Sequence, residues 1–104
     1  MIHVIATIEL KPDTRERVLK EFAQLVPQVR QEEGCIEYGG AVDFASGIPV
    51  QIPLRADVLT VVEKWASLDA LKAHLTAPHM NTYRAKVKDF VVKSSIQVLE
   101  PMKP

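Results

Sequence analysis

The stretch that decides the fold is VLTVVEKWASLDALKAHL, residues 58–75, which joins a strand pattern directly to a helix pattern. Val58–Trp65 is rich in β-branched residues and predicts a strand. Ser67 then stands where a hydroxyl can cap a helix. The apolar stripe of that helix consists of Leu68, Leu71 and Leu75. Pro78 breaks the helix and starts a short further helix that runs through about residue 89. A strand followed by a helix in two pieces is therefore expected.

The N-terminal third predicts a strand and a longer helix. Apolar residues alternate with more polar ones over residues 2–10 and predict a strand with one strongly apolar face, which Pro12 ends. Asp13 followed by Glu16 resembles a capping arrangement, so we expect the helix to begin there. Its apolar positions at helical spacing are Val18, Phe22, Leu25, Val26 and Val29. Pro27 predicts a kink or a thinning of this helix, and Gly34 predicts its C-terminal stop.

The remaining segments complete the pattern of an α+β protein. Residues 35–44 predict a second strand, and residues 45–55, with Gly47, Pro49 and Pro53, predict a long hairpin connection. The last strand is expected within residues 91–100, and residues 101–104 form a loose tail. The order is βαββαβ. With right-handed crossovers it predicts a ferredoxin-like antiparallel sheet with the helices on one face.

The other face of that sheet is predicted to pack against a second copy of the chain. On the first strand this face carries His3, Ile5, Thr7 and Glu9, a mixture that suits neither open water nor a full core. A short chain also buries a modest share of its surface by itself. Together these features predict a homodimer.

Composition narrows the classes of protein. The 104 residues fit a single domain, residues 1–104. Thirteen Lys and Arg balance thirteen Asp and Glu, which argues against nucleic acid as a partner. The sequence shows neither a signal peptide nor a membrane-spanning run. We therefore expect a cytoplasmic protein without a membrane partner. Cys35 is the only cysteine, so it forms no internal disulfide, and we expect a small buried residue rather than a nucleophile.

Three residues are the candidates for chemistry. Glu63 and Trp65 lie two apart on a strand and share a face, and His74 lies on the following helix at the edge of its apolar stripe. An imidazole can accept a proton from an acidic hydroxyl, a carboxylate can orient it, and an indole offers a flat surface to an aromatic ring. The alternative is structural: a strand Trp is often core, a helix-edge His is often half-exposed, and Glu63 can pair with a Lys or Arg.

Further residues can reach the same cleft. His79 follows Pro78, and Tyr38 and Tyr83 each combine an apolar body with a hydroxyl, although solvent exposure for the His and core packing for the Tyr residues are the simpler interpretations. Glycine-rich phosphate loops, a dinucleotide fingerprint and helical His pairs four apart are missing from the sequence. His74 and His79 are five apart across a proline, so no metal site is predicted.

At this point the sequence resembles the antibiotic biosynthesis monooxygenase family, and its small quinol monooxygenase-like members most of all. The likeness spans nearly the whole chain to Pro101, with an E-x-G-C-x-x-Y run ending at Tyr38, an E-x-W at Glu63–Trp65 and a helix His nine residues later. The resemblance implies a dimeric ferredoxin-like α/β barrel with one pocket per subunit between sheet and helices. It also implies oxidation of a quinol or polyphenol by molecular oxygen, without a metal or bound cofactor.

On this resemblance, roles follow for named residues. His74 is the base, Trp65 the ring-stacking wall and Glu63 the orienting carboxylate. The expected substrate-binding residues are Thr7, Phe22, Tyr38, His79 and Tyr83. Heme-degrading members of the family carry an Asn on the first strand, where this chain has Thr7 and Ile8, so heme is not expected.

Two other functions and one structural question stay open. A non-oxidative isomerase or lyase would use the same proton-transferring groups, and a non-catalytic stress-response dimer would use the same pocket to bind a small molecule. The stretch 39–55 is longer than the plain hairpin of the family. It either covers the pocket or reaches across a dimer.

Overall fold

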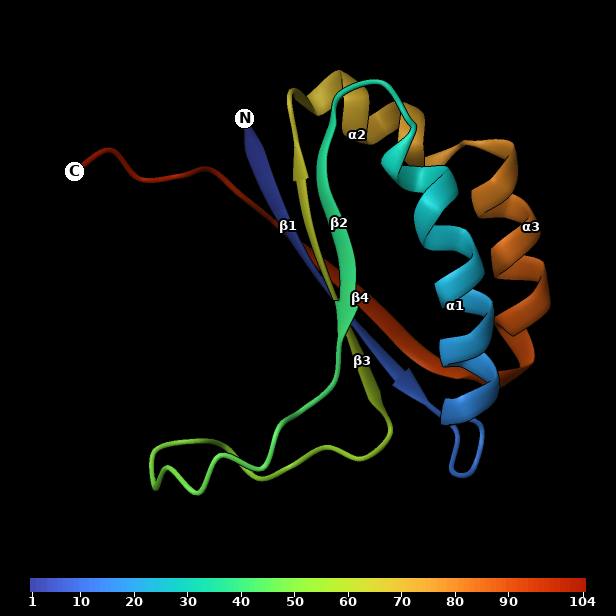
Figure 1. The fold of residues 1–104 in the computed structure, drawn as a ribbon, viewed down its shortest axis with the longest axis vertical. Coiled ribbons are helices and arrows are strands. Elements are labelled where there is room, and N and C mark those ends of the chain that lie inside the picture. Colours follow the sequence, from blue (N-terminus) through green and yellow to red (C-terminus); the bar gives the residue numbers. More distant parts are fainter.

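The computed structural model describes residues 1–104 as one antiparallel sheet with its helices on one face (Figure 1). The α+β class and the ferredoxin-like order predicted from the sequence are confirmed. The elements in chain order are β1 (Ile2–Leu10), α1 (Arg15–Arg30), β2 (Cys35–Ala41), β3 (Val58–Trp65), α2 (Leu68–Leu75), α3 (Pro78–Val87), a 3-10 turn (Lys88–Phe90) and β4 (Val91–Leu99).

The strands lie in the order β2-β3-β1-β4, so the two central strands are the two richest in apolar residues. The register sets rows of side chains across the sheet. Tyr38, Glu63 and Val4 are partners in one row, and Val61, Ala6 and Ile96 are partners in the next. Because side chains alternate along a strand, both rows face the helices. They provide the sheet side of the site described below.

Helix α1 packs its apolar stripe onto this face. Val18, Phe22, Leu25 and Val29 are buried, as their spacing predicts, and the helix continues through Pro27. The start of the helix differs from the prediction. Asp13 adopts a left-handed turn (φ 67°) and makes no cap, and Thr14 takes the cap position with its hydroxyl bonded to the Lys11 carbonyl. The turn that reverses the chain after β1 uses Asp13, so its carboxylate is not available to the helix amides.

The end of α1 also differs. The helix ends at Arg30, and Gly34 lies beyond it with φ at 81°, in the turn into β2. A Cβ at Gly34 would lie 2.6 Å from the Cβ of Ala70 on α2, so glycine permits both the backbone angle and the close approach. This turn brings the residues just before Gly34 next to α2.

Helix α2 buries a different stripe from the predicted one. Ser67 caps it through a bond from the Ala70 amide, as expected. Leu71 and His74 are its buried residues, whereas Leu68 is 49% and Leu75 36% exposed. Because α2 spans only Leu68–Leu75, it presents little more than two turns to the sheet, and the imidazole takes a position that a leucine was expected to fill.

The connection between β2 and β3 is a long arm, residues 42–57, because β2 ends at Ala41 and not at Phe44. The arm projects from the side of the sheet that carries no helix (Figure 1). At its base, the guanidinium of Arg55 donates hydrogen bonds of 2.8 and 2.9 Å to the carboxylate of Asp43. Five large apolar side chains on the arm are 55–89% exposed: Phe44, Ile48, Val50, Ile52 and Leu54. The C-terminal tail from residue 100 leaves on the same side.

Candidate active site

The three residues singled out by the sequence meet at one end of the sheet. Trp65 donates its indole N–H to Oε1 of Glu63 at 2.9 Å, and its ring lies against the imidazole of His74 with centroids 4.6 Å apart. The His74 Nε2 is 4.0 Å from the same Glu63 oxygen. Trp65 and His74 are 0% and 1% exposed, and Glu63 is 6% exposed. A carboxyl group and an imidazole are thus both held away from water, an arrangement that is typical of functional sites.

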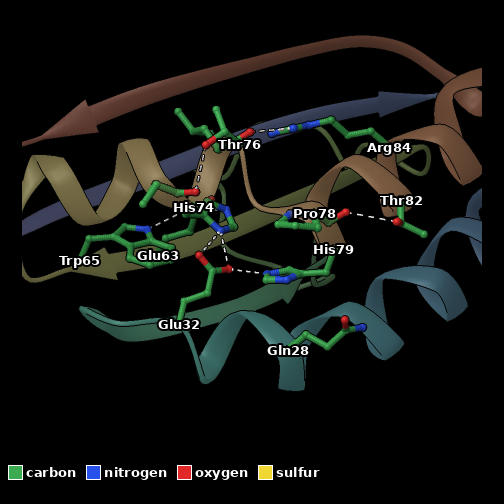
Figure 2. Close-up of polar contacts among 12 residues, drawn as sticks. Gln28, Glu32, Glu63, Trp65, His74, Thr76, Pro78, His79, Thr82 and Arg84 are labelled. Carbon is green, nitrogen blue, oxygen red and sulfur yellow. Dashed lines mark hydrogen bonds and ion pairs between the residues drawn. The ribbon is translucent and has the colours of Figure 1, made fainter.

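A second carboxylate, from the turn after α1, completes the cluster. Glu32 accepts from Nδ1 of His74 at 2.9 Å and from Nε2 of His79 at 2.7 Å (Figure 2). His79 is therefore engaged, although it faces Glu32 rather than an aromatic ligand. Glu32 has no role in the sequence-based prediction, because its partners lie 42 and 47 residues away in the chain.

Aromatic rings surround the imidazole from the strand and helix side. Tyr38 meets His74 edge-on with centroids 5.4 Å apart and stacks on Phe22 at 5.7 Å, and Tyr83 meets Phe22 edge-on at 6.1 Å. The three predicted aromatic residues are therefore adjacent. They line one wall that leads from His74 toward α3.

This wall belongs to a cavity of about 390 Å³ between the sheet and the helices. The cavity lining is mostly apolar. Its buried polar groups are Glu63 and His74, and further polar atoms come from Arg84, Lys88 and Ser94. The apolar and aromatic lining residues include Ala6, Ile8, Phe22, Tyr38, Val61, Met80, Tyr83, Val87 and Ile96. A mostly apolar cavity of this size with two buried titratable groups is typical of a small-molecule site.

Three of the predicted site residues do not line this cavity. Thr7 lies between Ala6 and Ile8, which do, so strand alternation places it on the opposite face. Trp65 is covered by His74 and backs the imidazole, so it does not provide the substrate-stacking wall. His79 borders a smaller hollow of about 120 Å³ between α1 and α3. Of the expected residues, Glu63, His74, Phe22, Tyr38 and Tyr83 do line the cavity.

Burial sets the electrostatics of the site. Desolvation raises the pKa of Glu63, and the bond from Trp65 and the nearby His74 oppose that rise only in part. Burial raises the pKa of Tyr38, with Glu63 adding to it, and raises the pKa of Tyr83 to about 12. Both phenols are therefore neutral hydroxyls near pH 7. Burial also raises the pKa of the half-buried Cys35 thiol, which is the opposite of what an activated nucleophile needs.

A more open hollow of about 480 Å³ lies between α1 and β2, lined by residues such as Leu19, Val26 and Gly40, and it holds neither His74 nor either buried carboxylate.

Nowhere do three or more His, Cys, Asp or Glu side chains form a group suited to a metal ion. No helix is both long and apolar enough to cross a membrane.

The fold and this cavity define a class of small ferredoxin-like α+β proteins with an internal pocket beside a buried histidine. The chain belongs to the antibiotic biosynthesis monooxygenase family, whose model matches residues 1–86. It is 41% identical over 103 residues to the probable quinol monooxygenase YgiN of Escherichia coli, covering 97% of this chain and 98% of that protein.

Solved structures agree with this assignment. The structure of Rv0793 from Mycobacterium tuberculosis matches with a TM-score of 0.79 at 27% identity, covering 99% of this chain and 96% of that one. PA3566 from Pseudomonas aeruginosa shares the fold, with a TM-score of 0.82 at 22% identity over 98% of this chain and 94% of that one.

Proposed function

We propose that this protein is a monooxygenase that oxidises a quinol or related polyphenol with molecular oxygen, without a bound metal or organic cofactor. The observation that carries the proposal is the cavity of about 390 Å³, in which a buried imidazole faces a mostly apolar, aromatic-lined space. The likeness to YgiN, named as a probable quinol monooxygenase, supports the substrate class.

The proposed chemistry begins with a proton transfer. Nε2 of His74 accepts the proton of a bound aromatic hydroxyl, and the resulting phenolate is electron-rich enough to reduce oxygen itself. One oxygen atom replaces a ring hydrogen, and the other leaves as water. The four electrons that oxygen takes up come from the substrate, two for the ring hydroxylation and two for the oxidation of the quinol to a quinone. The protein supplies binding, a base and exclusion of water.

Oxygen consumption with a panel of quinols tests the proposal, with product identified by mass. We expect turnover to fall by roughly 10²- to 10⁴-fold in His74→Ala, the usual contribution of a positioned general base. Lys72→Ala, an exposed residue on the same helix, is the matched control and should keep the wild-type rate. Activity unchanged in His74→Ala, or product formed under strict anaerobiosis, would contradict the mechanism; the second result would indicate an isomerase or lyase. Titration with hemin, followed at the Soret band, should give no binding.

The same proposal includes a homodimer formed through the helix-free face. That face carries Ile5, Thr7, Thr60 and Val62, which are only half-buried in the single chain, and the apolar arm 42–57 projects on the same side. In a two-fold pair, each arm can cover the partner's sheet and bury side chains that otherwise face water.

Sedimentation velocity tests the dimer. The wild type should sediment as a dimer, and the double variant Phe44→Ser, Val50→Ser should shift toward monomer, because these side chains are 78% and 89% exposed in the single chain. Leu68→Ser is the control, since this residue is 49% exposed but lies on α2, away from the arm. A monomeric wild type at tens of micromolar would contradict this part of the proposal.

A further inference from the structure

Glu32 holds two histidines from two helices with one carboxylate. Its Oε2 lies 2.9 Å from Nδ1 of His74 in the last turn of α2 and 2.7 Å from Nε2 of His79 at the start of α3. Its Oε1 lies 3.2 Å from the same Nδ1. The sequence-based prediction gave the orienting role to Glu63, so the contacts of Glu32 call for a separate explanation.

The chemistry of the three groups fixes where the hydrogens are. An ionised carboxylate can only accept hydrogen bonds, so each ring nitrogen that faces Glu32 must carry a hydrogen. A neutral His74 is then the Nδ1–H tautomer, and its Nε2 holds a free lone pair. We propose that Glu32 is the positioning residue of this site: it fixes the tautomer of His74 so that Nε2 is the proton acceptor, while His79 fixes the carboxylate.

Glu63 does not satisfy the same requirement. Its Oε1 is 4.0 Å from His74 Nε2, beyond hydrogen-bond distance, and already accepts the indole N–H of Trp65 at 2.9 Å. Around the imidazole, the groups that face it are the carboxylates of Glu32 and Glu63, the neutral phenol of Tyr38 and the indole. Glu32 is the one among them that bonds to a ring nitrogen.

The backbone around Glu32 is built to hold it in place. The Glu32 amide bonds to the Val29 carbonyl at 2.9 Å, the Glu32 carbonyl accepts from the Cys35 amide at 3.1 Å, and the Gly34 carbonyl accepts from the Ala66 amide at 2.8 Å. The side chain is 13% exposed, against 2% for His74 and 23% for His79. The cluster thus runs from a buried imidazole to a partly exposed one, with a fixed carboxylate between them.

The consequence for catalysis rests on the proposed function. When the substrate hydroxyl gives its proton to Nε2, His74 becomes an imidazolium whose Nδ1–H stays bonded to Glu32. The negative carboxylate stabilises that cation through a charge-assisted hydrogen bond and keeps its own form throughout. Without the carboxylate, the ring can turn or change tautomer, and a hydrogen on Nε2 would block it as a base.

The first test measures the tautomer directly, on the full chain without substrate. Nitrogen-15 NMR of the histidine rings, at a pH where His74 is neutral, should show the hydrogen on Nδ1 and a bare Nε2. Glu32→Gln should keep this pattern, because the amide oxygen can replace Oε2 as acceptor, whereas Glu32→Ala should move hydrogen onto Nε2. Glu33→Gln, an exposed neighbour, is the matched control and should change nothing. A hydrogen on Nε2 in the wild type, or an unchanged pattern in Glu32→Ala, overturns the proposal.

The second test separates positioning from structural support. With a quinol that the wild type oxidises, Glu32→Ala should lower kcat by roughly 10- to 100-fold with little change in KM, the range typical of losing the hydrogen-bond partner that orients a metal-ligating histidine. Glu32→Gln should recover part of that loss. An equal loss in both variants, or no loss in Glu32→Ala, overturns the catalytic role. If the NMR result holds but no quinol is oxidised, the proposed substrate chemistry fails while the positioning of His74 stands.

Discussion

The indole of Trp65 and the imidazole of His74 lie against one another with centroids 4.6 Å apart and planes 34° from parallel. Each also approaches the same oxygen of Glu63, at 2.9 Å from the indole nitrogen and 4.0 Å from Nε2. The indole therefore packs against the imidazole of His74 from behind. The aromatic lining of the cavity consists instead of Phe22, Tyr38 and Tyr83.

Replacing Trp65 with Phe should cost both stability and turnover. The variant loses a hydrogen bond to a buried carboxylate, which contributes about 1.5–3 kcal/mol, and leaves a cavity beside His74. We expect the free energy of unfolding to fall by about 2–4 kcal/mol in urea titrations followed by circular dichroism. A change below about 0.5 kcal/mol would mean that the indole N–H does not support Glu63.

The buried Glu63 should make the free energy of unfolding fall as pH rises. Burial raises its pKa in the folded state, so the folded chain resists losing this proton. The stability that the protonated form provides is present below the unfolded pKa near 4.5 and is lost as pH rises through the folded pKa. The melting temperature of Glu63→Gln should therefore be close to that of the wild type near pH 4 and higher than that of the wild type near pH 7.

The control for this pH effect is Glu37→Gln, an exposed carboxylate on β2 that pairs only with Lys64 at 3.3 Å. Its melting temperature should follow the wild-type pH curve. If Glu63→Gln does the same, the buried carboxylate is not the source of the pH dependence.

Two glycines with positive φ, Gly34 and Gly47, allow the energetic effect of the close approach between Gly34 and Ala70 to be measured. Gly34→Ala meets both the backbone strain and the Cβ of Ala70 at 2.6 Å, whereas Gly47→Ala, with φ at 75°, meets no atom within 4 Å. We expect Gly47→Ala to cost about 1 kcal/mol and Gly34→Ala at least about 1 kcal/mol more. Equal losses in urea unfolding would show that the turn beside Glu32 moves freely away from α2.

The edge strand offers a test of where substrate binds. Ile96 on β4 lines the cavity and is 50% exposed, so Ile96→Trp should fill the space without disturbing the core. We expect KM for the quinol to rise by roughly tenfold or more, the result of losing about 1.4 kcal/mol of binding. Val98→Trp, two residues along on the same face and outside the cavity lining, should leave KM unchanged.

Much of the fold follows from local patterns. The alternation over residues 2–10, the helical spacing from Val18 to Val29 and the Ser67 cap each identify an element, and the βαββαβ order then fixes the sheet. The errors lie where tertiary contacts decide. The left-handed turn at Asp13 removes a cap that the sequence favours, and the short α2 buries His74 in preference to Leu75.

The candidate site was predictable only in part. Spacing brings Glu63, Trp65 and His74 together, because they lie on a strand and the helix that follows it. Glu32 could not be found in this way, since its partners are far along the chain and the turn at Gly34 is what delivers it. The local signal was its position as the first residue of the E-x-G-C-x-x-Y run, which supports the family resemblance but gives Glu32 no role.

The burial of Trp65 has a practical consequence. It is the sole tryptophan of the chain, it is 0% exposed and it lies against His74. Its emission therefore originates from a single place, in contact with the imidazole of His74. Ligand entry, protonation of the imidazole and the first loosening of this end of the sheet can each be followed in the unmodified protein, by fluorescence and without any attached label.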